Sequence, residues 1–256
     1  MARDRAREAA ATRSRGGPVP SRGLLSDVRH YLLHSPSSPT RIEFASPDVR
    51  EEYGRRILQR LGVSVEPYDV LNIHRIGVDV PARYVFGELR SPEVATLCWP
   101  CHLAALERVG KGTERLRVYL LGRRGSLFGP LFQLDELQVQ DRPDAQDVDS
   151  ARFLLFSCSG GYPIGILSVY VRSSIPSQGE REQTQVFFLV SFNFYGKRNW
   201  PGSHLMGGFW EWIHNRVTSN ILTRFKELCE ARFEALRESG LADAEHQTRD
   251  APAPSS

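Results

Sequence analysis

The sequence predicts an α+β fold in which one curved antiparallel β-sheet grips a long C-terminal α-helix, preceded by an N-terminal helical extension. Three observations support this. Five candidate strands follow one another between about residues 114 and 195 with short turns between them, which favours antiparallel hairpins. One of these strands changes the side of its apolar residues midway, as a bent strand does. Residues 203–236 carry an apolar stripe at helical spacing.

Composition sets the class of protein. The chain has 256 residues, 41% apolar and 25% charged, which is enough material for a packed core in one large domain or two small ones. A net charge of +3 gives no reason to expect specific nucleic-acid binding. No run reaches the roughly 18 to 20 apolar residues of a transmembrane segment, and no apolar secretory signal is present. We therefore expect a cytoplasmic protein.

Both ends are predicted to be disordered. Residues 238–256 are rich in Ala, Pro and Ser, and residues 1–22 form a basic tail with few acids. A weak transit-peptide character is one alternative for this tail, and weak contact with an anionic surface is another. Its arginines are Arg3, Arg5, Arg7, Arg13, Arg15 and Arg22.

Residues 23–66 are predicted to form a helical extension of two helices. The first carries an apolar stripe within 24–33, made of Leu24, Leu25, Val28, Leu32 and Leu33. The second begins with Ser46 as N-cap before Pro47, and Gly62 is placed to end it. Its stripe consists of Val49, Tyr53, Ile57 and Leu61. Neither helix can bury its stripe alone, so we expect them to dock on the sheet.

The main domain is expected over 67–237. It begins with a strand at 68–80, followed by a helical stretch over 82–106 that Pro92 and Pro100 interrupt. Five further strands are predicted at 114–121, 131–140, 151–159, 164–174 and 183–195, separated by turn-forming residues.

Two of these strands describe the shape of the sheet. In 183–195, Val186, Phe188 and Val190 lie on one face of the strand, and Phe187 and Leu189 lie on the other. We therefore expect other elements to cover both faces of this strand. In 131–140 the apolar residues change parity near Asp135-Glu136, which predicts a β-bulge there. A bulged strand bends, and a bent sheet has a concave side.

The closing helix begins near Ser203, a candidate N-cap, and its stripe is clear from Trp210 onward. Glu227, Glu230 and Glu234 fall on the opposite side. A stripe of this size must lie across a face of the sheet. It comprises Trp210, Ile213, Val217, Ile221, Phe225 and Leu228, and toward the C-terminus it is widened by Leu222, Cys229, Phe233 and Leu236.

Over residues 66–237 the sequence resembles the SRPBCC superfamily, the START-like helix-grip proteins that include polyketide cyclases and lipid-transfer domains. The local resemblance lies in DVPARYVFGELRSPEVATLCWPC, where a first strand leads into two short helices. Its marks are Val80-Pro81, Tyr84-Val85-Phe86, Ser91-Pro92 and Trp99-Pro100. The superfamily has seven strands, of which six are identified here, so one strand is short or missed.

The resemblance implies a cavity between the concave sheet and the terminal helix for an apolar ligand of lipid, isoprenoid or polyketide type. The side chains expected to face it are Trp99, His102, Tyr170, Phe188, Phe192, Trp210, Val217 and Ile221. Each of these residues could equally belong to a solid core.

Cys98-Trp99-Pro100-Cys101-His102 has the spacing of a haem-attachment, dithiol or half-zinc motif. Each of these roles lacks its sequence context: an export signal, a thioredoxin-like βαβ unit, or two further zinc ligands. The simplest interpretation is two small buried side chains in a helix, with a redox or metal role as the alternative. His30 and His34 share a helix face but form only a fragment of a metal site. No metal or cofactor is therefore predicted.

No catalytic motif of the hydrolase, zinc-protease, dinucleotide or P-loop type occurs. Two basic pairs, Arg123-Arg124 and Lys197-Arg198, lie in turns where they could meet an anionic headgroup. The polar candidates for acid–base work are His74, His102, Tyr170, Arg172 and Tyr195. Three hypotheses follow: a binding or transfer protein for an apolar molecule, an enzyme of cyclase, aromatase or hydrolase type, and a solidly packed interaction protein without a cavity.

Overall fold

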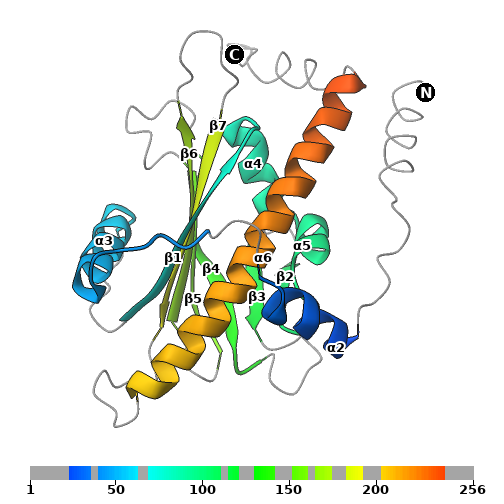
Figure 1. Cartoon of the computed structure of the whole chain (residues 1–256). Coiled ribbons are helices and arrows are strands. Elements are labelled where there is room, and N and C mark those ends of the chain that lie inside the picture. The colour runs from blue at the N-terminus through cyan, green and yellow to red at the C-terminus, as the bar shows by residue number, and fades with distance from the viewer. Residues whose placement is uncertain are drawn as a thin grey trace.

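A curved antiparallel sheet of seven strands packs against one long helix in the computed structural model (Figure 1). The structure describes residues 23–35, 40–62, 69–110, 115–120, 130–141, 152–160, 165–174, 183–192 and 203–239. The predicted basic tail, the last residues of the chain, Arg123-Arg124, Tyr195 and Lys197-Arg198 lie outside these ranges. The α+β fold class expected from the sequence is confirmed.

The elements follow one another in the expected order. Every neighbouring pair of strands is antiparallel, and the sheet order is β1-β7-β6-β5-β4-β3-β2. The helices are α2 (Leu24–Asp27), η1 (Val28–Leu33), α3 (Pro47–Arg60), α4 (Ala82–Leu89), α5 (Pro92–Cys98) and α6 (Ser203–Glu238). The strands are β1 (Asp69–Val78), β2 (Ala104–Arg108), β3 (Leu116–Leu120), β4 (Gln133–Asp141), β5 (Arg152–Cys158), β6 (Gly165–Ser174) and β7 (Gln183–Phe192).

The strand missed in the sequence is β2. Its residues, AALER, are good helix formers, and the first three of them lie in the helical stretch predicted over 82–106. In the structure α5 ends at Cys98, and Ala104–Arg108 pairs with β3 at the edge of the sheet. Tertiary pairing decides here, because strand formation depends on neighbouring strands more than on local preference.

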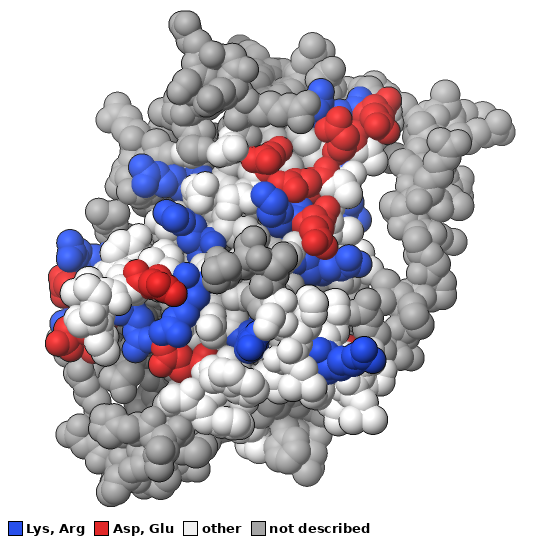
Figure 2. Space-filling model, viewed as in Figure 1, with Lys and Arg blue, Asp and Glu red and all other residues white. Residues whose placement is uncertain are grey.

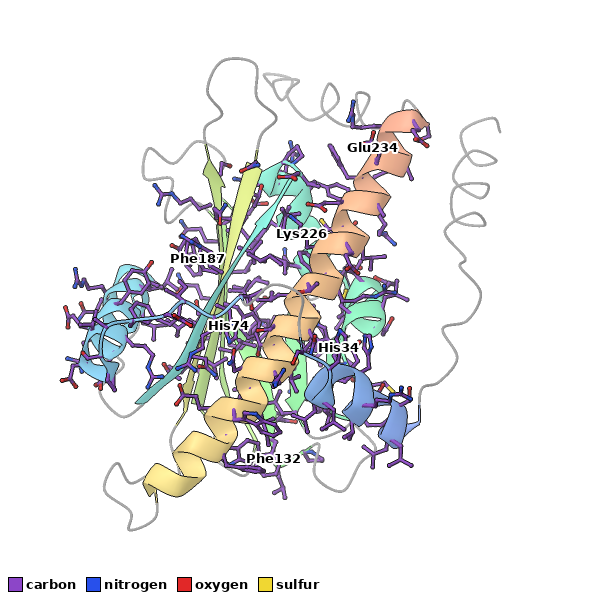
Figure 3. All side chains as sticks on the ribbon, viewed as in Figure 1. His34, His74, Phe132, Phe187, Lys226 and Glu234 are labelled. Carbon is purple, nitrogen blue, oxygen red and sulfur yellow. The ribbon has the colours of Figure 1, made fainter. Side chains whose placement is uncertain are left out.

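Both faces of the central strands are covered, as predicted. Val186, Phe188 and Val190 belong to the core beneath α6, whereas Phe187 and Leu189 belong to a second core beneath α3. The rings of Tyr170 and Phe187 stack with centroids 4.5 Å apart in this second core. Figure 3 shows Phe187 on the α3 side of the sheet.

The predicted β-bulge is also confirmed. The register between β4 and β5 shifts between Glu136 and Gln138, so Leu137 is the extra residue. Leu134, before the bulge, is buried in the core beneath α6, whereas Leu137 is 62% exposed. The bulge bends β4 and gives the sheet its concave side.

Helix α6 crosses the concave side of the sheet diagonally (Figure 1). Its most buried apolar residues are Leu222, Phe225 and Cys229, which all belong to the predicted stripe or to its C-terminal widening, whereas Ile213, Val217 and Ile221 of that stripe are only half-buried. Thr218, Ser219 and Asn220 are also buried, because the helix is covered by η1 as well as by β1. Figure 2 shows acidic side chains along its C-terminal half, where Glu227 and Glu234 are exposed as predicted.

The N-terminal extension contacts both sides of the sheet. Helix α3 starts at the predicted N-cap, Ser46, whose hydroxyl accepts a hydrogen bond from the Val49 amide, and packs on β1 from the convex side. Residues 40–42 lie along the edge of β1, where the Ile42 amide donates to the Ile73 carbonyl (2.9 Å). Helices α2 and η1 then lie beside α6 on the other side. The extension therefore covers an edge strand that would otherwise present unpaired backbone groups.

The predicted stripe of the first helix is wrong. Leu24, Leu25 and Leu33 are exposed, whereas Asp27 and Tyr31 are buried. The backbone takes π-helical form over Val28–Leu33, which changes which side chains point inward. Within the described ranges, no helix combines the length and hydropathy needed to cross a bilayer.

Leu58 should anchor α3 to the sheet more than any residue of its predicted stripe, because it is 0% exposed. We expect Leu58→Ala to lower the free energy of unfolding by about 2–5 kcal/mol. The matched control is Val49→Ala on the same helix, where the side chain is 49% exposed and the change should stay within about 0.5 kcal/mol. Urea unfolding measures both, and equal effects would contradict docking of α3.

Candidate functional site: an apolar cavity beneath α6

A cavity lies between the concave face of the sheet, α5 and the middle of α6. The cavity and its open mouth together contain about 540 Å³ of space outside the protein atoms. Only about 40 Å³ of this space can accommodate the centre of a water molecule. By that second measure one water needs about 10–15 Å³, so the cavity holds about three. It is lined by Glu88, Leu89, Val94, Ala95, Cys98, Trp99, Leu106, Leu154, Phe156, Leu167, Val169, Phe188, Ile221, Leu222 and Phe225.

Glu88 is the charged residue among these lining side chains. Its side chain is 11% exposed and lies 3.2 Å from the Arg232 guanidinium of α6. Tyr84 lies one turn earlier on α4, and burial, followed by the Glu88 carboxylate, raises the pKa of its hydroxyl above the usual range. The tyrosine therefore stays protonated. The cavity thus has an apolar wall and one polar end.

Cys98 lines the cavity from α5, and Cys229 lies in the same core on α6. Burial raises the pKa of the Cys98 thiol to about 12, and it raises the pKa of Cys229 above its usual range. Both residues are free cysteines and 1% exposed or less. At neutral pH they are protonated thiols, which are poor nucleophiles.

Of the eight residues predicted to face a ligand, three line the cavity and the others whose side chains the structure describes do not. Trp99, Phe188 and Ile221 line the cavity. Tyr170 points to the opposite, α3 side of the sheet, because it alternates with the lining residue Val169 along β6. His102 is exposed in the turn after α5.

The other three lie along β7 and α6. Trp210 and Val217 are half-buried toward the N-terminal half of α6, outside the lining, and the side chain of Phe192 lies outside the described residues. Sequence reasoning missed Glu88 and the α5 residues Val94, Ala95 and Cys98. The i, i+4 spacing of Tyr84 and Glu88 was the available signal for the polar end.

A second polar cluster lies on the concave side, between β1 and α6. The buried Thr40 hydroxyl contacts His74 Nδ1 (2.9 Å) and donates to the Ser219 hydroxyl of α6 (2.9 Å). His74 Nε2 is buried without a hydrogen-bond partner among the described residues. Burial lowers the pKa of His74 to about 3, and positive charge on His214 and Arg41 lowers it further. His74, labelled in Figure 3, is therefore a neutral imidazole at physiological pH.

Ion pairs continue this cluster to the surface. Glu211 of α6 accepts hydrogen bonds from Arg41, beside the edge of β1, and from Arg50 of α3 (2.6 Å). Its backbone carbonyl accepts from the Asn72 side chain (3.1 Å). These contacts hold the N-terminal half of α6 against the extension. The cavity lies further along, beneath the middle of α6.

A strand, two short helices, six antiparallel strands and a closing helix over the concave side define a helix-grip protein. This is the helix-grip fold that the resemblance to the SRPBCC superfamily predicts, and the missing seventh strand is β2.

Several solved structures are similar in fold. The Zhui aromatase/cyclase from Streptomyces sp. R1128 is 17% identical, with 63% of this chain and 93% of that chain covered and a TM-score of 0.42. The protein TTHA0849 from Thermus thermophilus is 10% identical, with 62% and 96% covered and a TM-score of 0.37. The di-domain ARO/CYC BexL from the BE-7585A biosynthetic pathway is 18% identical, with 64% and 46% covered and a TM-score of 0.37.

No family model matches the chain, and no curated protein matches it. The likeness to the solved structures concerns the fold alone, and TM-scores this low carry no argument about ligand or reaction. The fold assignment rests on the element order and the strand order described above.

Stability should decrease as the pH falls because of His74. Its pKa is about 3 in the folded chain and 6.5 in the unfolded chain, so between these values the unfolded chain binds more protons. The contribution of neutral His74 to the free energy of unfolding should therefore be fully present above about pH 6.5. Below that pH it should decrease, with a slope that approaches about 1.4 kcal/mol per pH unit. His74→Gln should reduce this slope in urea titrations by about half, because burial also lowers the pKa of His214 to about 4 and that histidine adds a similar pH dependence. His34→Gln, at an exposed histidine, should leave it unchanged.

Proposed function

We propose that this protein binds an apolar small molecule of lipid, isoprenoid or polyketide type between the concave sheet and α6. The observation that supports this most is the cavity lining, which is apolar except at Glu88 and two weakly polar side chains, Cys98 and Trp99. Small-molecule sites commonly have this character, with apolar walls and a few polar groups that orient the ligand. Trp99, Phe188 and Ile221 are the predicted ligand contacts that fit the site.

Glu88 gives the bound molecule an orientation. Its carboxylate is already paired with Arg232, so it suits a ligand with a hydroxyl or amine at one end rather than a second anion. The rest of the molecule would contact Leu154, Leu167 and Val169 on the sheet. The ligand class is therefore an amphipathic molecule with a large apolar part.

The ligand must widen the cavity, because space for about three waters is too little for a ring system. The lining offers a route for this. Trp99 at the end of α5 and Ile221 on α6 are only half-buried, so their side chains can move outward without leaving a well-packed core. The polar cluster at Glu211 lies toward the N-terminal end of α6, away from this movement.

An enzyme of cyclase, aromatase or hydrolase type is the alternative function. Such chemistry needs at least two titratable groups in reach of the substrate. Among the described lining residues the titratable groups are Glu88 and Cys98, and burial keeps the thiol protonated. The structure similarity to aromatase/cyclases adds no argument at this level. Binding or transfer therefore has the better support.

Two neighbouring residues of β6 test the site with matched substitutions. Leu167 lines the cavity and Ile166 lies in the core beneath α3, and each is 6% exposed. We expect Leu167→Phe to weaken binding of the neutral dye N-phenylnaphthylamine at least about tenfold, because the ring occupies the cavity. Ile166→Phe should leave the affinity unchanged, although both substitutions cost about 1–3 kcal/mol of stability. Fluorescence titration measures the affinity.

An equal loss of dye binding in both variants would contradict the cavity as the site. Native mass spectrometry of the chain purified from its own cells complements the dye and identifies the natural ligand class. A co-purifying apolar molecule that is lost in Leu167→Phe and kept in Ile166→Phe supports the proposal. Turnover of such a molecule by the wild-type chain would instead favour the enzyme.

A further inference from the structure

A separate cluster of metal-binding residues lies where the N-terminal extension meets the turn after α5. Asp27, Cys101 and His102 each place a ligand atom within 4.8 Å of the other two. The Cys101 thiol donates a hydrogen bond to Asp27 Oδ2 across 3.3 Å, although the two residues are 74 positions apart. We propose that these three residues bind one zinc-class divalent cation.

The donor atoms suit zinc. A thiolate sulfur, an imidazole nitrogen and a carboxylate oxygen are its ordinary protein ligands, and three of them leave a tetrahedral position for water. In such a site a sulfur and an oxygen are about 3.5 Å apart, given metal distances of about 2.3 and 2.0 Å. The Cys101–Asp27 separation of 3.3 Å is close to this value. The His102 ring nitrogen lies within 4.8 Å of both atoms, so a change of its side-chain rotamer would bring it to the same centre.

Asp27 provides an independent observation for a cation. It is 2% exposed, and a buried carboxylate needs a positive partner or strong hydrogen-bond donors. The donor it has is a thiol, which is weak. Among the described residues no lysine or arginine forms an ion pair with it. A bound cation would supply the missing charge.

The backbone holds both halves of the cluster in place. The amides of Leu103 and Ala104 both donate to the Pro100 carbonyl (2.8 and 2.9 Å), which fixes the turn that carries Cys101 and His102. On the other side, the Tyr31 hydroxyl donates to the Cys98 carbonyl (2.8 Å), which holds η1 against the end of α5. The backbone segments that carry the ligands are therefore held in place before a metal arrives.

The structure also shows why the C-x-x-C spacing is misleading. Cys98 is 1% exposed and faces the cavity, whereas Cys101 is half-buried and faces Asp27. The two cysteines of the motif therefore lie in different environments and do not form a dithiol pair. The third ligand comes from the distant extension, which local spacing cannot reveal.

Metal binding would replace one proton and one hydrogen bond of the cluster. The Cys101 thiol loses its proton to solvent, its hydrogen bond to Asp27 ends, and the thiolate and the Asp27 carboxylate both bind the cation. The metal would link α2 to the turn that follows Trp99, a wall residue of the cavity. Its role is a cross-link between the extension and the main domain.

Cobalt titration of the tag-free full-length chain tests the site. One equivalent of Co²⁺ should produce a thiolate-to-cobalt charge-transfer band in the near ultraviolet, which zinc then displaces. Cys101→Ser should remove the band, and Cys158→Ser, at a half-buried thiol on β5, should keep it. The melting temperature should rise with zinc in the wild-type chain and in Cys158→Ser alone.

His102→Gln keeps the test informative if the cysteine variant fails to fold, because His102 is exposed and its replacement spares the core. Loss of this ligand should weaken cobalt affinity at least about 100-fold, beyond the usual effect of an outer-shell change. Affinity unchanged in His102→Gln, or a charge-transfer band that survives in Cys101→Ser, would overturn the proposal.

Discussion

Burial of the inner face of α6 is the constraint on which the rest of the structure depends. Leu222 and Phe225 are almost fully buried against the concave sheet, and each contributes about 1.5–3 kcal/mol of gross transfer free energy. This burial requires a sheet that is concave, which the bulge at Leu137 provides. It also requires that polar residues on the same helix find partners, because a 36-residue helix lying in a groove is covered on more than one side.

The N-terminal extension supplies many of those partners. Thr40 bonds Ser219, the Tyr31 carbonyl accepts from Asn220 (2.8 Å), and Arg41 and Arg50 pair with Glu211. Without residues 23–62 these groups of α6 would be left exposed or unsatisfied, at a cost of about 1–3 kcal/mol for each buried one. The extension therefore completes the hydrogen bonding of α6 on the side that the sheet does not cover. It also covers the edge of β1, which limits pairing with other chains.

The sequence predicted what depends on local pattern. The two-sided strand at Phe187 and Phe188, the bulge near Glu136 and the N-cap at Ser46 follow from alternation, parity and capping chemistry. It failed where a distant partner decides. Strand β2 has helix-forming residues and pairs with β3, and on α3 Leu58 is buried whereas Val49 of the predicted stripe is exposed.

The same limit applies to the site. Phe188 and Ile221 could be predicted as lining residues because Phe188 lies on the inner parity of β7 and Ile221 lies on the closing helix. The partners of Glu88 and Asp27 could not be predicted, since each lies far along the chain, Arg232 in one case and Cys101 in the other. Both distant contacts meet at the short helices between β1 and β2. Helix α5 forms a wall of the cavity on one side and is held by the extension through Tyr31 on the other. Movement of this wall, which a ligand of useful size requires, is therefore linked physically to how firmly the extension is attached.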